Sequence, residues 1–363
     1  MMVSRLGVLT IAVALACGNG LAEDQDVVLY NGGPQHTGVY DTEPLTELKG
    51  LKWKFETIGE VTSPPLIHDG IVYFGDWKGY FYAVDVKTGE EKWRFLAGEA
   101  AAGPPTLCGG IAYWGCRAGF FYALDSVTGE EKWRIEVDGG ICFPPLIRGG
   151  LAYFTSHAKQ LYIANIKTAE LVDTIKTDNG MCCSPSLLDG AVYFTDWDGN
   201  VYAMDVETRT QKWRFKAKKK IYHAPAIYEG TGYVGSHDST VYAIDLETGK
   251  ERWRFKTDGP IGNDPAVGEG IVYLSTRDSH FHALDAKTGR EIWNLKKEGK
   301  VYAKPALAGN VVYFGGGDYF LYALDPRTGV EKWKFQAANM VCNPVVHGGM
   351  VFFGSGAALY ALE

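Results

Sequence analysis

The sequence predicts an all-β fold, because one pattern of short strands and tight turns recurs along most of its length. Residues 70–95 contain three segments rich in Val, Tyr, Phe and Trp, separated by polar turn residues, as is typical of strands. The pattern returns every forty residues, and a fixed period of this length indicates a solenoid, a propeller or another array. A Trp marks the same place in most copies: Trp53, Trp93, Trp133, Trp213, Trp253, Trp293 and Trp333, with Asp173 where one more is due.

Each copy contains four segments with strand patterns. In the copy quoted above, the first segment follows Pro65, and the others span residues 71–75, 80–85 and 91–95. Residues such as Gly and Asp between the first two segments have the chemistry of tight hairpin turns. Each copy is therefore expected to form one four-stranded antiparallel sheet.

The number of strands predicts how the fold closes. After residue 60 the sequence contains eight first, eight second and eight third strands, but only seven fourth strands. The eighth fourth-strand pattern lies at residues 51–55, ahead of all the others. A strand taken from the other end of the chain can complete the last sheet and remove an open edge from the ring. We therefore predict an eight-bladed β-propeller whose last blade is completed by residues 51–55.

The residues before the repeats have a different character. Arg5 precedes an apolar run that ends at Ala16, and a small-x-small site follows, so residues 1–22 are predicted to be a secretory signal peptide. An alternative to simple cleavage of the signal peptide is lipidation at Cys17, which would attach the protein to a membrane. Residues 23–50, here called the lead-in, show no strong periodicity, and residues 51–363 are predicted to be one propeller domain.

The composition excludes some classes of function. The chain has 363 residues, of which 46% are hydrophobic, as expected for a well-packed globular protein. Its net charge is −7, whereas a nucleic-acid-binding protein usually has a broad basic surface. The lysines within residues 216–220 are expected to be solvated. We expect a monomer that binds no nucleic acid.

A motif inside the repeat resembles one from a known family. Ala83, Asp85, Thr88, Gly89 and Trp93 are spaced as in the tryptophan-docking motif of the pyrroloquinoline-quinone (PQQ) repeat family. The complete motif begins again at Ala123, Ala243, Ala283 and Ala323. This resemblance implies a propeller over about residues 51–363.

The motif residues are expected to be structural. The Thr-Gly turn reverses the chain, and the Trp ring buries a large apolar area between neighbouring blades. Two copies depart from the pattern: one is degenerate, with Ile163, Asn165, Ala169 and Asp173 at the motif positions, and the next has Arg209 in place of the Gly.

The resemblance implies two kinds of function. Quinoprotein dehydrogenases of this fold oxidise alcohols or sugars with PQQ and Ca²⁺, whereas the BamB-type lipoprotein of the outer-membrane assembly machine is not catalytic. The repeats here follow one another without the long insertions that build an enclosed pocket in the enzymes. We therefore expect a BamB-like scaffold in the periplasm or cell envelope, with a protein partner and no cofactor.

A small PQQ-dependent alcohol or sugar dehydrogenase remains the alternative. Its quinone would lie at the channel mouth near Cys182 and Cys183, because related enzymes stack PQQ on neighbouring cysteines. By the same resemblance, Asn263 would be a Ca²⁺ or cofactor ligand, Asp264 the base that takes the substrate hydroxyl proton, and Lys304 the partner of a quinone oxygen. The ring of mouth positions contains no Glu to complete a Ca²⁺ site, which favours the scaffold.

The cysteines allow other chemistry at the same mouth. Cys142 and Cys182 occupy equivalent positions in adjacent blades, so they are candidates for a disulfide in an exported protein. A Cys/His metal site that includes His223 is an alternative, but no CxxC or His-x-His spacing supports it there.

Overall fold

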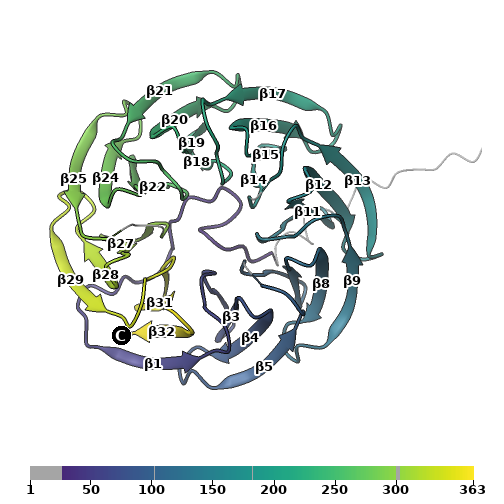
Figure 1. Cartoon of the computed structure of the whole chain (residues 1–363), viewed down its shortest axis with the longest axis horizontal. Coiled ribbons are helices and arrows are strands. Elements are labelled where there is room, and N and C mark those ends of the chain that lie inside the picture. Colours follow the sequence, from purple (N-terminus) through teal and green to yellow (C-terminus); the bar gives the residue numbers. More distant parts are fainter. Residues whose placement is uncertain (1–26, 102, 182, 300–302) are drawn as a thin grey trace, which may run out of the picture.

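A computed structural model describes residues 27–363 with the exception of 102, 182 and 300–302. Within these residues, eight sheets of four antiparallel strands surround a central channel (Figure 1), which confirms the predicted eight-bladed β-propeller. No described residue belongs to a helix long and apolar enough to cross a membrane. The predicted signal peptide and Cys17 lie outside the described residues.

We number the blades 1–8 in chain order, and each blade runs from an inner strand at the channel to an outer strand at the rim. The strands of blades 1–4 are β2 Leu66–His68, β3 Ile71–Gly75, β4 Tyr80–Asp85 and β5 Glu91–Leu96; β6 Thr106–Cys108, β7 Ile111–Gly115, β8 Phe120–Asp125 and β9 Glu131–Glu136; β10 Leu146–Arg148, β11 Leu151–Ser156, β12 Gln160–Asn165 and β13 Glu170–Lys176; β14 Ser186–Leu188, β15 Ala191–Thr195, β16 Asn200–Asp205 and β17 Gln211–Lys216. Those of blades 5–8 are β18 Ala226–Tyr228, β19 Thr231–Ser236, β20 Thr240–Asp245 and β21 Glu251–Lys256; β22 Ala266–Gly268, β23 Ile271–Ser275, β24 His280–Asp285 and β25 Glu291–Lys296; β26 Ala306–Ala308, β27 Val311–Gly315, β28 Phe320–Leu324 and β29 Glu331–Gln336; β30 Val345–His347, β31 Met350–Gly354, β32 Ala358–Leu362 and β1 Leu51–Glu56.

The two ends of the propeller meet in blade 8. Strand β1 pairs antiparallel with β32, with Lys54 opposite Tyr360 and Phe55 opposite Leu359. The sheet order is β1-β32-β31-β30, so the N-terminal strand supplies the missing outer strand. This confirms the closure predicted from the number of strands.

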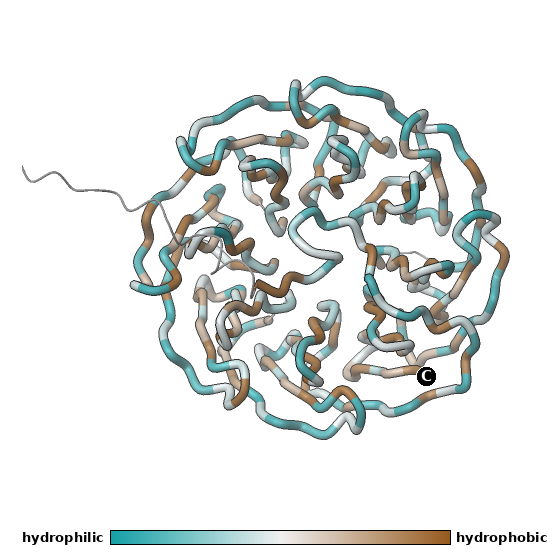
Figure 2. Tube along the Cα trace, turned by 180° about the vertical axis from the view of Figure 1, so that it is seen from behind, coloured by the Kyte–Doolittle hydropathy of each residue, from teal (hydrophilic) through white to brown (hydrophobic). Residues whose placement is uncertain are grey.

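The core lies between the blades. The middle strands are buried on both faces, as at Val72, Phe74 and Tyr82, because each sheet is covered by its neighbours. The outer strands alternate between exposed and more buried residues, as in β5, since their outward side chains meet water. Figure 2 shows the resulting hydrophilic rim around a more hydrophobic interior.

In the described part of the chain, five junctions between blades are formed by the Trp of one repeat and the Gly of the next. The Trp93 indole packs on Gly129 of blade 2, and its Nε1 donates a hydrogen bond to the Ser126 carbonyl (3.1 Å). Gly129 has φ +76°, and a Cβ there would lie 2.6 Å from the ring, so both the turn and the ring require glycine. The same packing joins Trp53 with Gly89, Trp213 with Gly249, Trp253 with Gly289, and Trp293 with Gly329.

The junction of blades 3 and 4 is built differently. Asp173 occupies the Trp position of blade 3, Arg209 occupies the Gly position of blade 4, and the two side chains form an ion pair of 3.4 Å. The neighbouring Tyr153 hydroxyl is buried without a hydrogen-bond partner, whereas the equivalent Tyr73 hydroxyl donates to the Ser126 carbonyl. The departures at positions 173 and 209 therefore meet at one junction.

The described part of the lead-in, residues 27–50, enters the channel (Figure 1). It pairs by main-chain hydrogen bonds with the middle residues of several inner strands before it continues into β1. The first of these residues is Leu107 in β6, which exchanges two hydrogen bonds with Val28, and the last is Leu307 in β26, which bonds Gly38 and Tyr40. The segment that lacked periodicity is therefore part of the channel lining.

Candidate functional site

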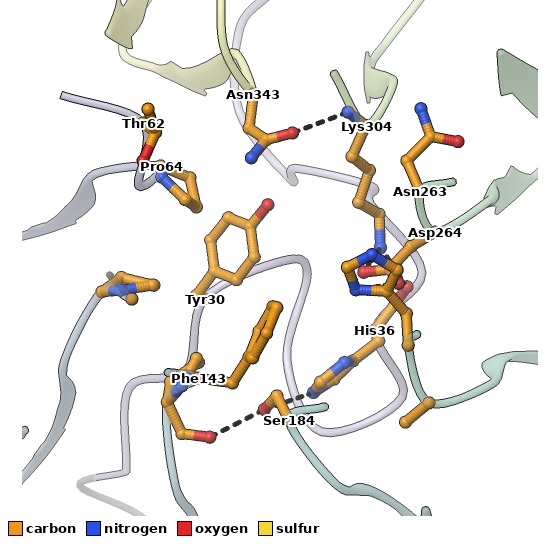
Figure 3. Close-up of a pocket in the computed structure, with 15 residues that line it drawn as sticks. Tyr30, His36, Thr62, Pro64, Phe143, Ser184, Asn263, Asp264, Lys304 and Asn343 are labelled. Carbon is orange, nitrogen blue, oxygen red and sulfur yellow. Dashed lines mark hydrogen bonds and ion pairs between the residues drawn. The ribbon is translucent and has the colours of Figure 1, made fainter. Parts of the chain in front are cut away.

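A pocket of about 130 Å³ lies in the channel, at the mouth formed by the segments that precede the inner strands. Side chains from several blades point into it, together with Tyr30 and His36 of the lead-in (Figure 3). Three of the predicted site residues, Asn263, Asp264 and Lys304, are among its lining residues. The repeat spacing predicted these three residues of the pocket. Tyr30 and His36 could not be predicted from the spacing, because they precede the repeats.

A buried ionic cluster forms one wall of the pocket. The Asp264 carboxylate lies 3.3 Å from Lys304 Nζ and 3.1 Å from His223 Nδ1. The Lys304 ammonium also donates a hydrogen bond to the His36 carbonyl at 3.0 Å. Through this bond the charge pair of blades 6 and 7 fastens the lead-in inside the channel.

The cluster shifts the acidity of its members. Burial alone would raise the pKa of Asp264, but His223, Lys304 and His36 hold it below its usual value. Burial lowers the pKa of Lys304, and the Asp264 charge opposes that change. Both groups are therefore expected to be charged and engaged with each other near neutral pH, so that Asp264 is not a free base.

The pKa of His36, another base of the pocket, is also shifted. This histidine is 5% exposed and has φ +54°, and its ring lies 3.4 Å from the Ser184 hydroxyl. Burial and the Lys304 charge lower its pKa to about 4, although Asp264 acts in the opposite direction. The folded protein therefore holds His36 neutral.

Replacing His36 by Asn is expected to flatten the acid side of the stability profile. The folded pKa of His36 lies below its unfolded pKa, so its stabilisation is complete above about pH 6.5 and is lost as the pH falls toward 4. Between pH 7.5 and pH 5 the wild type should lose about 2 kcal/mol more than His36→Asn. Urea unfolding of both proteins at the two pH values measures this difference, and equal losses would contradict a buried neutral His36.

The other predicted site residues lie around the pocket or away from it. The Asn263 amide donates to the Ala303 carbonyl (2.6 Å) and to the Ser275 hydroxyl, and its Oδ1 is buried without a hydrogen-bond partner. Cys183 is buried in the core between blades 3 and 4, where burial raises the pKa of its thiol to about 11. A thiol of this kind is protonated at neutral pH and weakly reactive.

The predicted cysteine pairings cannot be located in full. Cys182 lies outside the described residues, and with it the Cys182–Cys183 pair and the proposed Cys142–Cys182 bridge. The Cys142 sulfur lies 3.3 Å from His157 Nε2. His223, the histidine of the alternative metal site, instead contacts Asp264 and lies edge-on to Phe143.

The residues around the pocket do not fit a quinone with a bound metal ion. Asp264 is the only carboxylate among the lining residues, and it is already paired with two bases, whereas Ca²⁺ takes six to eight oxygen ligands. Across the described part of the chain, no group of three or more His, Cys, Asp or Glu side chains is arranged to hold a metal. Tyr30 and His36 also take up space at the channel centre.

A second surface with unusual properties is the outer strand β13. At the three positions where β5 has Glu91, Lys92 and Arg94, β13 has Leu171, Val172 and Thr174. Leu171 is 42% exposed and Val172 is 41% exposed. At these three positions β13 lacks the charged side chains that usually discourage pairing with another chain, whereas Glu170 and Lys176 at its two ends are charged and exposed.

Comparisons with known proteins agree with this fold. The family described as outer membrane protein assembly factor BamB matches residues 17–104, 96–172, 149–237 and 197–363. The crystal structure of BamB from Moraxella catarrhalis is 17% identical with a TM-score of 0.75, over 86% of this chain and 99% of that one. No curated protein sequence matches the chain.

Two enzymes share the architecture as well. A europium-containing methanol dehydrogenase is 12% identical, with a TM-score of 0.80, over 92% of this chain and 97% of that one. A quinohemoprotein alcohol dehydrogenase from Pseudomonas putida is 14% identical, with a TM-score of 0.81, over 95% and 81% of the two chains. At such low identities these similarities show only the fold. The chemistry has to be argued from the residues of the site.

Proposed function

This chain belongs to the family of the outer membrane protein assembly factor BamB, and from that premise we propose that it is a protein-binding scaffold of the cell envelope without catalytic activity. The predicted signal peptide supports export to the periplasm, where a monomeric scaffold would act without a cofactor or nucleic acid. The pocket supports the absence of turnover, because its one carboxylate is already held by Lys304 and His223.

The observation that carries the proposal is the exposed apolar pair Leu171 and Val172 on the outer strand β13. Strand β13 is the outer strand of blade 3, so its outward main-chain groups are open to another strand. The exposed Leu171 and Val172 would add apolar contacts, as at docking surfaces. The neighbouring junction is held by the Asp173–Arg209 ion pair without a stacked Trp. We therefore propose that an edge strand of a folded envelope protein pairs with β13.

Restoring the missing charges is expected to abolish this interaction. The variant Leu171→Glu with Val172→Lys introduces the side chains found in β5, and should reduce partner binding at least tenfold by opposing strand addition. Photo-crosslinking from position 174 in intact cells, followed by mass spectrometry, identifies the partner and measures its yield in each variant. Val127→Lys provides the matched control, because Val127 is 70% exposed on another blade.

Two results would contradict the scaffold. One is a crosslinking yield that the charged variant leaves unchanged. The other is saturable binding of PQQ with Ca²⁺ by the purified protein, together with reduction of a dye by alcohols or glucose. That turnover would establish the dehydrogenase instead.

A further inference from the structure

The lead-in follows the inner rim of the propeller, where the inner strands would otherwise present unpaired main-chain groups. Its carbonyls accept hydrogen bonds from the middle residue of one inner strand after another, at 2.7–2.9 Å in blades 4–7. These pairs are Leu187 with Pro34, Ile227 with Gln35, Val267 with Thr37, and Leu307 with Gly38. In blade 2, Leu107 exchanges hydrogen bonds with Val28. The lead-in therefore satisfies main-chain donors of the inner strands along much of the rim, and forms isolated β-bridges at Val28 and Val39.

The rim is not covered all the way round. Among the described residues, the equivalent N–H group of Ile147 in blade 3 has no such main-chain partner. The same is true of Ile67 in blade 1 and Val346 in blade 8. Blades 1 and 8 are adjacent and lie between the entry of the lead-in at blade 2 and its exit at blade 7. In Figure 1 the lead-in loops through the side of the channel that faces β14, β18 and β22. The sector at β2 and β30 is thus left open between its two arms.

The open sector coincides with a groove of about 310 Å³. Its walls are the two arms of the lead-in, residues 28–32 and 39–42, and the inner strands of blades 1 and 8. Most of its side chains are apolar, including Ile67, Val345 and Val346. Ile67 faces Val72 in a pair that forms no hydrogen bonds within the hairpin. Its N–H and carbonyl therefore point into the channel.

We propose that this groove binds an extended apolar segment of another polypeptide, which pairs with the inner edges of β2 and β30. The occupant continues the line of pairing that the lead-in already makes with five other blades. Val28, Val39 and Tyr40, which pair with the rim on either side of the groove, are β-branched or aromatic residues of the kind that favour extended pairing. Main-chain hydrogen bonds supply the affinity, and the apolar walls select the side chains.

This site is separate from the outer strand β13, since it lies inside the ring. It requires an unfolded or extended segment, whereas β13 requires the exposed edge of a folded partner. The charged β13 variant is therefore expected to keep the groove functional, so the two proposals fail independently.

The test uses the full-length protein and a short fluorescent peptide in which valine and threonine alternate. Fluorescence anisotropy should show saturable binding, and a peptide with the same side chains but N-methylated main-chain amides should bind at least about tenfold more weakly, because it lacks the donors. Hydrogen exchange at the Ile67 amide should slow when the unmethylated peptide is added.

Two proline variants locate the site. Ile67→Pro removes the N–H that faces the groove, in an edge strand where proline is tolerated, and should weaken peptide binding at least about tenfold. Ile147→Pro is the matched control, because Ile147 is the equivalent residue of blade 3 and does not line the groove. The control should bind the peptide as the wild type does.

Several outcomes would overturn the proposal. One is the absence of binding at peptide concentrations of about 1 mM. A second is equal binding by the N-methylated peptide or by Ile67→Pro. A third is an Ile67 amide that is already protected in the free protein, since the groove would then be filled by this chain or by a second copy, which sedimentation velocity distinguishes.

Discussion

Replacing Lys304 by Met is expected to lower the free energy of unfolding by about 3 kcal/mol. The substitution keeps the apolar stem but leaves the Asp264 carboxylate, whose side chain is 13% exposed, without its ammonium partner. Removing one member of a buried ion pair costs more than removing both, because the remaining charge stays desolvated. The variant also loses the hydrogen bond from Nζ to the His36 carbonyl, which loosens the lead-in. Urea unfolding at pH 7.5, followed by Trp fluorescence, measures the change.

The double variant Lys304→Met with Asp264→Asn is the control. It removes both charges and should recover most of the lost stability, to within about 1 kcal/mol of the wild type. Hydrogen exchange at Leu307, whose amide bonds the lead-in carbonyl of Gly38, should accelerate in both variants if Lys304 anchors that segment. Equal stability of the single and double variants would show that Asp264 does not depend on Lys304.

The repeat made the propeller predictable from sequence, because comparison of the copies separates shared residues from local ones. Strand patterns, turns and the displaced strand at residues 51–55 all follow from that comparison, and the structure confirms the ring and its closure. The mouth residues Asn263, Asp264 and Lys304 were found in the same way, as positions at which the copies differ.

The position of the lead-in could not be predicted by comparing the repeat copies. This segment binds the rim mainly through main-chain carbonyls, as at Pro34, Gln35 and Gly38, and main-chain pairing places little restriction on side chains. No period therefore marks residues 27–45, and nothing in the sequence indicated that Tyr30 and His36 complete the pocket. For this reason, the two lining residues that the lead-in contributes were not predicted.

The junction of blades 3 and 4 shows an intermediate case. Asp173 and Arg209 were both visible as departures from the repeat, but their partnership was not. They are 36 residues apart, the same separation as Trp93 and Gly129, because each outer strand reaches the turn of the next blade. At the five junctions where a Trp packs on a Gly, a Cβ at the turn position would collide with the indole. The loss of glycine at position 209 is therefore compatible with a small side chain at position 173.

Replacing Trp93 by Ala is expected to destabilise the protein by about 3–5 kcal/mol. The indole is 7% exposed, packs on Gly129 and donates a hydrogen bond to the Ser126 carbonyl. Its removal leaves a cavity between blades 1 and 2 and takes away one of the two hydrogen bonds to the Ser126 carbonyl, the other being that from the Tyr73 hydroxyl, and both effects reduce stability. The midpoint of urea unfolding, followed by circular dichroism, should fall accordingly.

The matched control for Trp93→Ala is Asp173→Ala, at the equivalent position of blade 3. Its ion pair with Arg209 joins side chains that are 40% and 33% exposed, so water screens the interaction and its loss should cost less than about 1 kcal/mol. A loss as large as that of Trp93→Ala would mean that the ion pair fully replaces the stacked indole. A small loss would show that the junction of blades 3 and 4, next to the exposed Leu171 and Val172 of β13, is weaker than the Trp-docked junction of blades 1 and 2. A partner strand added to β13 would then stabilise the ring next to this weaker junction.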